Sequence, residues 1–178
     1  NHQAFLKGIL PDGETAVIDG NRQTADANIY TIALKAGAIP TALVNTQFNE
    51  YAASASPNGR WLAYQSNESG RPEIYVRELV GSGGRWPIST GGGEEPRWSP
   101  DGKELYYRVD NQLMAVPIET SSSFHAGTPT NLFNEVYDLR SNSGQTYTVD
   151  PRGGRFLMIR PPKEDSSAHI RVVVNWFE

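Results

Sequence analysis

The chain has 178 residues, of which 38% are hydrophobic and 20% are charged, a composition typical of about one globular domain. The formal net charge is −4, which makes the chain a poor candidate for nucleic-acid binding, because that binding rests on clustered Lys and Arg. There is no cysteine, which excludes disulfides, thiolate metal sites and cysteine nucleophiles. No apolar run approaches the about 18 residues of a membrane span. We therefore expect neither a nucleic-acid partner nor membrane insertion by this chain.

One four-residue pattern recurs along the chain and predicts its organisation. A proline stands second and a glycine fourth, and the prolines lie at positions 11, 57, 100 and 151, with spacings of 46, 43 and 51 residues. Such spacings are typical of β-propeller blades, which have roughly 40–50 residues. Proline fixes φ for a type I turn and glycine accepts a positive φ, so each pattern predicts a hairpin with a bulge. We expect each Pro-x-Gly turn to join two antiparallel strands.

The segments around each turn predict four short strands per repeat. Several of them, such as Leu105-Tyr106-Tyr107, are apolar on both faces, as expected for sheets that are covered on both sides. No segment has the apolar spacing of a helix. The expected strands are 3–9, 14–19, 28–34 and 40–45, then 50–55, 61–65, 73–79 and 85–89, then 96–99, 104–109, 112–118 and 129–133, and finally 146–149, 155–160 and 169–177.

These elements predict an all-β fold, a β-propeller with about four four-stranded antiparallel blades in one domain. The approximate blade limits are 1–45, 46–90, 91–134 and 135–178. The fourth blade lacks an outer strand and the chain begins on an inner strand, so we expect an open ring with exposed strand edges. The abrupt start at Asn1 indicates a piece of a longer protein. Further blades of the same polypeptide or a second copy in a homodimer are the two expected ways to complete the ring.

The residues around the third turn carry a family resemblance. Residues 99–107, Ser-Pro-Asp-Gly-Lys-Glu-Leu-Tyr-Tyr, resemble the repeat of TolB-like β-propellers, and residues 56–64 match it nearly as well. The first and fourth repeats depart from it, because Leu10 and Asp150 stand where serine is usual. The resemblance implies a bacterial propeller that binds partners, with a periplasmic or extracytoplasmic location favoured. The ending 172–178 is similar to the tail of multidomain proteins in which a propeller follows a kinase-type or regulator-type module.

The side chains that could carry chemistry are scattered. The three histidines, His2, His125 and His169, are far apart in the sequence, whereas metal sites need convergent ligands. The glycine-rich segment 81–84 is typical of a turn and does not match a serine nucleophile elbow. The four tryptophans either pack between blades or stack on sugars or peptides, and we favour packing. We expect no catalytic residue, no metal site and no cofactor.

Binding is expected at the end of the sheets opposite the Pro-x-Gly turns, where the longer loops gather. Both signs of charge occur there, which favours a protein or peptide over a strongly charged ligand; the alternative is that these side chains are only solvated. We expect a non-enzymatic module that binds a protein or peptide. The alternatives are the propeller part of a larger hydrolase or Ser/Thr kinase-like protein, and a carbohydrate-binding propeller. The candidate binding residues are Arg22, Glu50, Glu68, Arg71, Glu94, Glu95 and Arg140.

Overall fold

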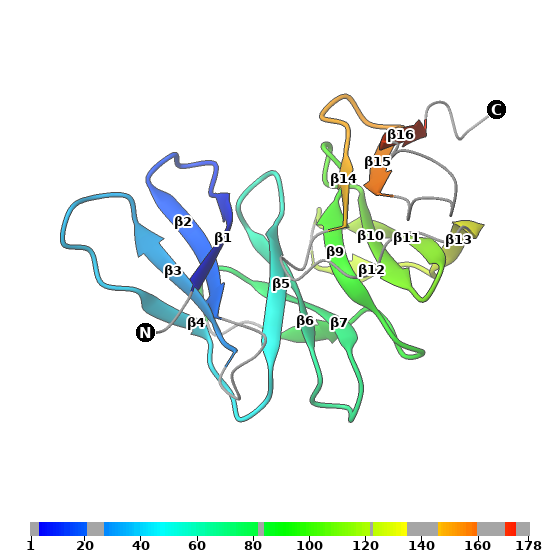
Figure 1. The fold of residues 1–178 in the computed structure, drawn as a ribbon. Coiled ribbons are helices and arrows are strands. Elements are labelled where there is room, and N and C mark those ends of the chain that lie inside the picture. The colour runs from blue at the N-terminus through cyan, green and yellow to red at the C-terminus, as the bar shows by residue number, and fades with distance from the viewer. Residues whose placement is uncertain are drawn as a thin grey trace, which may run out of the picture.

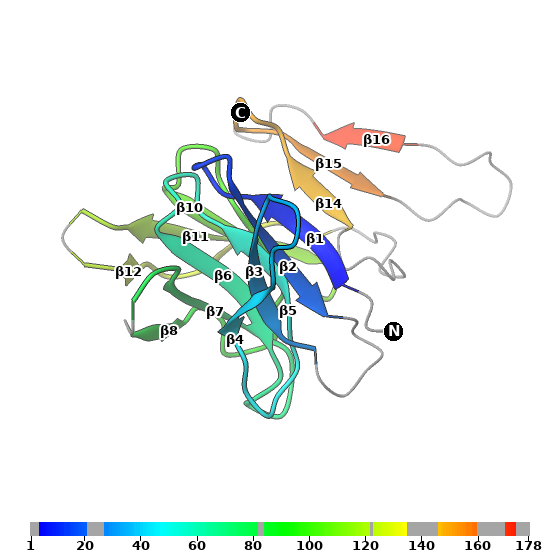
Figure 2. The same cartoon turned by 90° about the vertical axis from the view of Figure 1, so that its left-hand side faces the viewer.

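The computed structural model describes residues 4–20, 27–81, 84–121, 123–134, 146–159 and 170–173. Within these residues the chain forms sixteen strands and no helix, which confirms the all-β prediction. The strands form four antiparallel sheets that follow one another in chain order (Figure 1). In Figure 2, where the first sheet faces the viewer, the last sheet projects beyond the others in the view, while its buried side chains pack against the third sheet. The sheets are the blades of an open propeller.

Blades 1 and 2 each have the expected four strands, in sequential order. Blade 4 has three described strands; the prediction that it lacks an outer strand concerns residues 174–178, which lie outside the described residues. The strands are β1 (Ala4–Ile9), β2 (Thr15–Gly20), β3 (Ile29–Ala33) and β4 (Thr41–Val44) in blade 1, β5 (Glu50–Ala55), β6 (Trp61–Ser66), β7 (Glu73–Glu78) and β8 (Arg85–Pro87) in blade 2, β9 (Glu94–Trp98), β10 (Glu104–Val109), β11 (Gln112–Glu119), β12 (His125–Ala126) and β13 (Thr130–Asn134) in blade 3, and β14 (Tyr147–Val149), β15 (Phe156–Ile159) and β16 (Ile170–Val173) in blade 4.

The outer edge of blade 3 differs from the prediction. Two short strands pair with β11 there: β13 with its first half and β12 with its last two residues. With eight residues, β11 is longer than β3 or β7, so it leaves room for two partners. Gly127, just after β12, donates its N–H to the carbonyl of Pro117 at 2.8 Å. The expected outer strand is therefore present, and β12 is an addition that no residue pattern predicted.

All four Pro-x-Gly turns have the predicted form. In each, the glycine N–H donates to the carbonyl of the residue before the proline, and the glycine φ is positive. In blade 3 the Ser99 hydroxyl also donates to Asp101 at 2.7 Å and accepts the N–H of Glu104 at 2.9 Å. Asp101 in turn accepts the N–H of Lys103 at 3.1 Å. Serine before the proline and aspartate after it therefore close the turn with their side chains.

These hydrogen bonds make the stability contributed by the blade 3 turn depend on pH. Those from Ser99 and Lys103 lower the pKa of Asp101 below its usual 3.8. A carboxyl whose pKa is lowered on folding stabilises the fold above its unfolded pKa, and this contribution is lost as the pH falls through the folded pKa. In blade 2, Asn58 makes the equivalent bonds, from Ser56 at 2.7 Å and from Arg60 at 3.0 Å.

We therefore expect Asp101→Asn to keep the turn and to remove its titration. At neutral pH the variant should be slightly less stable than the parent, and at a pH below the lowered pKa of Asp101 the difference should vanish. Urea denaturation at the two pH values measures it. An equal difference at both values would mean that the ionised carboxylate does not stabilise the turn.

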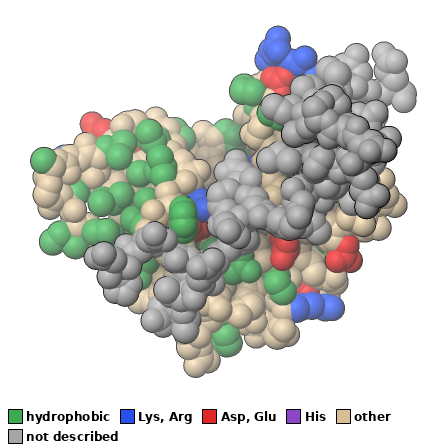
Figure 3. Space-filling model, in the orientation of Figure 1, with side chains coloured by type: hydrophobic (Ala, Val, Ile, Leu, Met, Phe, Trp, Pro, Cys, Tyr) green, Lys and Arg blue, Asp and Glu red, His purple; other side chains and the backbone are tan. Residues whose placement is uncertain are grey.

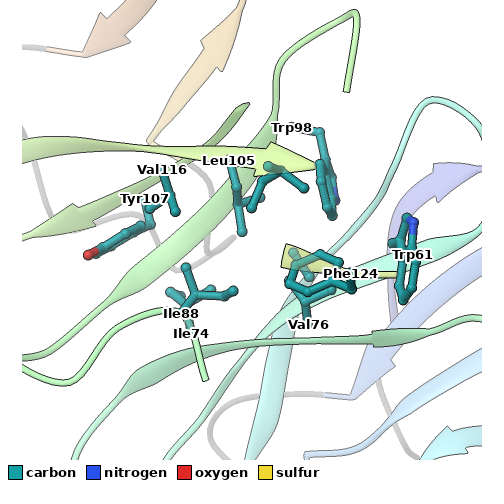
Figure 4. Packing of buried hydrophobic residues seen from close by; sticks show 11 residues of the cluster. Trp61, Ile74, Val76, Ile88, Trp98, Leu105, Tyr107, Val116 and Phe124 are labelled. Carbon is teal, nitrogen blue, oxygen red and sulfur yellow. The ribbon is translucent and has the colours of Figure 1, made fainter. Parts of the chain in front are cut away.

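The core lies between the blades and follows a positional rule. Residues five and seven after each turn proline point to the preceding blade, and residues six and eight point to the following one, because side chains alternate along a strand. In β6, Leu62 and Tyr64 pack towards blade 1, while Trp61 and Ala63 pack towards blade 3. Figure 4 shows the second of these interfaces, with Trp61 beside Phe124 and Leu105 close to Trp98. Its buried residues are Trp61, Ala63, Ile74, Val76, Ile88, Trp98, Leu105, Tyr107, Val116, Ile118 and Phe124.

The same rule leaves one apolar face of blade 1 without a described neighbour. Ile18, seven residues after Pro11, pairs with Leu6 and Tyr30, so the three side chains share the outer face of the sheet. Leu6 is 64% exposed, and Ile9, on the same face, is 56% exposed. Figure 3 shows apolar side chains gathered over this blade. An open ring is thus present, and completion by further blades or by a second copy stays a prediction.

Neighbouring turns also nest in one another. A Cβ on Gly59 would lie 3.0 Å from Cδ of Pro11, and one on Gly102 would lie 3.6 Å from Cδ of Pro57. A Cβ on Gly153 of blade 4 would meet nothing within 4 Å, whereas between blades 1 and 2 and between blades 2 and 3 the turn proline of one blade thus lies on the turn glycine of the next. This contact fixes the spacing of the blades at the end of the sheets that carries the turns, which we call the turn end; the opposite end is the loop end.

Candidate functional site

The turn end carries hollows that the sequence did not predict. A groove of about 610 Å³ lies between the turns of blades 2 and 3, and one of about 350 Å³ lies between the turns of blades 1 and 2. The larger has a volume typical of small-molecule sites. Trp61 lines it, but this side chain is only 1% exposed, so it offers little surface to a ligand.

The predicted binding residues divide into exposed and buried side chains. Arg22 and Arg140 lie outside the described residues. Glu94 and Arg71 are exposed. Arg71 donates from Nε to Glu73 at 2.9 Å and from Nη2 to the carbonyl of Thr90 at 2.6 Å. The structure therefore holds this arginine in place while leaving it accessible to a partner.

Glu68 is partly buried and forms an ion pair with Arg85. The Arg85 guanidinium lies over the Tyr75 ring, 4.7 Å from its centroid. The hydrogen bond and charge of Glu68 raise the pKa of Arg85, although burial opposes this. Glu68 thus forms part of a fixed charged pair on the surface of blade 2.

Glu50 and Glu95 are buried, being 1% and 5% exposed, so neither is a solvated loop residue. Burial raises the pKa of Glu50, whose Oε1 accepts the hydroxyl of Thr46 and whose Oε2 has no hydrogen-bond partner. The Oε2 atom of Glu95 accepts the N–H of Thr146 at 2.8 Å and its hydroxyl at 2.7 Å. Glu95 therefore ties blade 3 to blade 4 and is not available to a ligand from solution.

Buried carboxylates recur at the loop end in the same role. Each accepts a backbone N–H from a loop or from the next blade, and a carboxylate bonded in this way is a strong anchor. These anchors hold the loop end in one arrangement without a ligand. The pairs are Asp19 with Ala52 N–H at 2.8 Å, Glu73 with Gly92 N–H at 2.9 Å, and Glu95 with Thr146 N–H at 2.8 Å.

The anchor at Glu73 depends on a close backbone approach at Gly93. A Cβ there would lie 2.6 Å from Oγ of Ser89 and 2.8 Å from Cγ1 of Ile74, while Ser89 itself bonds both Glu73 and the N–H of Ile74. Gly93→Ala should therefore lower the free energy of unfolding by about 2–3 kcal/mol, as overpacking does. Gly91 has open space around it, so Gly91→Ala is the matched control, with a change of less than about 0.5 kcal/mol. Equal effects in chemical denaturation would contradict the close approach.

The first strands of the blades, β1, β5, β9 and β14, are the inner strands, and three of them carry a β-bulge. The register shifts by one residue between Leu6 and Gly8 in β1, between Tyr51 and Ser54 in β5, and opposite Tyr106 to Arg108 in β9. Ala52 and Glu95, each five residues before the turn proline, have a φ of 55°. Positive φ at a non-glycine residue is strained, and such strain is concentrated at functional sites. Bulges are also frequent next to such sites, because they change the direction in which a side chain points.

Charged side chains gather on and beside these bulged strands. Lys7 forms an ion pair with Asp19 at 3.2 Å, with the two side chains 7% and 2% exposed. Arg108 is 4% exposed and donates to the hydroxyl of Thr146 and to the carbonyl of Asp110. Arg97, in β9, donates from Nη1 to the carbonyl of Pro96 at 3.0 Å.

The sequence prediction missed these charged residues, although one signal was present. Asp19 and Arg108 both stand eight residues after the turn proline, at the end of an apolar strand, and Gln65 holds the same position in blade 2. All three are buried. A polar residue that recurs at a buried strand position indicates a structural or functional polar contact.

The described residues show no metal site, since no three His, Cys, Asp or Glu side chains among them are grouped to hold an ion. In the same part of the chain, no helix is long and apolar enough to cross a membrane.

No protein-family model matches the chain. Solved structures do match its fold. TolB from Acinetobacter baumannii matches with a TM-score of 0.70 and 18% identity, over 98% of this chain and 41% of that chain. A protein designated TolB from Agrobacterium tumefaciens matches with a TM-score of 0.65 and 20% identity, over 93% of this chain and 58% of that chain. The chain has a TolB-like β-propeller fold.

The TolB-like fold is shared with an enzyme. The periplasmic gluconolactonase PpgL from Pseudomonas aeruginosa matches with a TM-score of 0.54 and 10% identity, over 93% of this chain and 55% of that chain. The TolB-like chain therefore spans less than two thirds of the length of each of these proteins. At these identities the likeness shows the fold, and the fold alone hosts more than one function.

Proposed function

We propose that this TolB-like chain is a non-enzymatic module that binds a protein or peptide at its loop end, against the inner strands. The observation that carries the proposal is the repeated bulge of β1, β5 and β9, with strained residues at Ala52 and Glu95. Such strain persists only where the surrounding structure holds it. Here the buried carboxylates supply that hold, since Asp19 bonds the N–H of Ala52.

The exposed side chains of the loop end support the same class of ligand. Arg71 and Glu94 carry opposite charges on loops that are already fixed. Complementary charges of both signs select a protein surface by matching its pattern. A surface that is ordered before binding loses less conformational entropy when the partner arrives.

The tryptophans give less support to carbohydrate binding. Trp61 and Trp98 are buried between blades 2 and 3, and Trp86 packs against them; Trp176 lies outside the described residues. An aromatic platform for a sugar needs an exposed ring face. These three side chains therefore act as core residues, as the sequence predicted.

The test for binding uses a library of random twelve-residue peptides displayed on phage and selected on the immobilised chain. Selected peptides are synthesised, and their affinity is measured by calorimetry. We expect Glu94→Lys combined with Arg71→Ala to weaken binding about tenfold or more. Lys103→Glu at the turn end, where the Lys103 side chain is 79% exposed, is the control and should leave the affinity unchanged. If only the control variant loses binding, the site lies at the turn end and the proposal is wrong.

To test whether the chain is an enzyme, we choose glucono-1,5-lactone as the substrate, because a gluconolactonase has a similar fold. We expect hydrolysis no faster than the spontaneous rate at any concentration of the chain. A rate that rises in proportion to the chain and is saturable in the lactone would overturn the non-enzymatic assignment.

We also propose an extracytoplasmic location. The TolB-like fold and the similarity to a protein named a periplasmic gluconolactonase support it. Fractionation of cells that express the natural gene tests it, with the periplasmic fraction expected to contain the protein and the cytoplasmic fraction as the contradicting outcome.

A further inference from the structure

Arg97 stands out among the charged residues of the inner strands because its charge is not matched. Its Nε atom is buried and has no hydrogen-bond partner. The guanidinium has five N–H donors, and among the described residues the structure shows one bond, from Nη1 to the carbonyl of Pro96. No carboxylate of the described residues lies within ion-pair distance. The side chain is partly exposed, and a partly buried cation without a charged partner still costs the fold free energy.

The nearby carboxylates are already engaged. Asp19 bonds Lys7 and the N–H of Ala52, and Glu95 bonds the N–H and hydroxyl of Thr146. Burial lowers the pKa of Arg97, and the charges of Glu95 and Asp19 offset this only in part. Asp19 belongs to blade 1 and Arg97 to blade 3, so the guanidinium lies where the inner strands of different blades face each other.

The other two buried cations of this region already have partners. Lys7 forms an ion pair with Asp19. Arg108 is satisfied by neutral oxygens, those of Thr146 and Asp110. Arg97 is therefore the cation that keeps donors available.

We propose that Arg97 binds a carboxylate of the ligand, either the C-terminal carboxylate of a peptide or an aspartate or glutamate side chain. The inference rests on the proposed function and names the chemical group that the bound peptide must present. Arginine suits this task because its planar fork matches two carboxylate oxygens at once. One carboxylate would supply both the missing charge and the missing acceptor for Nε.

The first test uses sodium acetate as the probe and the Nε–H resonance of Arg97 as the readout, in ¹⁵N–¹H NMR spectra of the whole chain. Arg97→Lys assigns the resonance by removing it. We expect a saturable shift with a dissociation constant on the order of 10 mM. Sodium chloride at the same ionic strength should give no such shift, and neither should the Nε–H of Arg60, an exposed arginine paired with Glu78. A shift that does not saturate, or that chloride reproduces, would overturn the proposal.

The second test uses the peptides selected on the chain. Arg97→Gln should weaken binding about tenfold or more, whereas Arg60→Gln should not. Amidating the peptide C-terminus, or replacing its Asp and Glu residues by Asn and Gln, shows which carboxylate is read, because the matching change should abolish the effect of Arg97→Gln. If neither change does so, the proposal is wrong.

A structural role for Arg97 predicts a different result, since Arg97→Gln would then lower the thermal stability. We expect this variant to be as stable as the parent or more stable, because it removes a partly buried charge that has no ion-pair partner among the described residues. The two proposals fail separately. Peptides that depend on Glu94 and Arg71 but not on Arg97 would refute the carboxylate site alone. Saturable acetate binding without any selected peptide would refute the proposed function alone.

Discussion

Trp61→Ala is expected to lower the free energy of unfolding by about 3–5 kcal/mol, the usual loss for a fully buried aromatic side chain. Trp61 is 1% exposed and lies between blades 2 and 3. Its ring centroid is 5.4 Å from that of Trp86, in an edge-on arrangement, and 5.0 Å from that of Phe124. The truncation leaves a large cavity at the interface on which both central blades depend. Guanidinium denaturation followed by far-ultraviolet circular dichroism measures the effect.

Trp61→Phe is the matched control. The Nε1 atom of Trp61 is buried without a hydrogen-bond partner, so phenylalanine loses no hydrogen bond and keeps most of the packing. We expect a loss of less than half that of the alanine variant. If both variants are equally destabilised, the indole N–H has a partner that the structure does not show.

Glu95→Ala should lower the stability by about 2–4 kcal/mol, because it leaves the N–H and hydroxyl of Thr146 without their acceptor in the interior. The loss should be local. Glu95 bonds blade 4 to blade 3 at the loop end, together with Arg108, so amide hydrogen exchange should quicken in β14 and the adjoining strands of blade 4. Exchange in β6 and β7 should be unchanged.

The control for this prediction is the preceding residue. Glu94 is exposed, and Glu94→Ala should change the stability by less than about 0.5 kcal/mol. Exchange that quickens in all blades of Glu95→Ala would contradict a local anchor and indicate that the four blades unfold as one unit.

Much of the fold was predictable because the information is local. The turn pattern fixes φ at Pro100 and Gly102 through their own chemistry, and the strand beginning at Glu104 follows directly. The predicted strand 104–109 agrees with β10, and 50–55 agrees with β5. The bulges of the inner strands were not predictable, because a bulge appears only when one strand is paired with another.

The site was less predictable for the same reason. Glu50 and Glu95 were expected at the surface because acidic residues are seldom buried without a partner. The partner of Glu95 is Thr146, 51 residues further along the chain, and no pattern in the sequence joins the two. Arg97 was missed because it follows Pro96 in a strand that shows no alternation of apolar and polar residues. Arg97 is of interest because its Nε atom lacks an acceptor, and this lack can be recognised only in the three-dimensional structure.

The nesting of turn proline on turn glycine has an evolutionary consequence. Pro11 lies against Gly59, and Pro57 lies against Gly102, in each case across a blade boundary. We expect a change at either position of such a pair to alter the effect of a change at the other, although 48 and 45 residues separate the paired positions in the sequence. Repeats coupled in this way depend on their neighbours. The turn of one blade therefore diverges only as far as the turn beside it allows. A Cβ on Gly153 of blade 4 would meet nothing within 4 Å, and this uncoupled turn is the one of the four that carries a basic residue, Arg152, between proline and glycine.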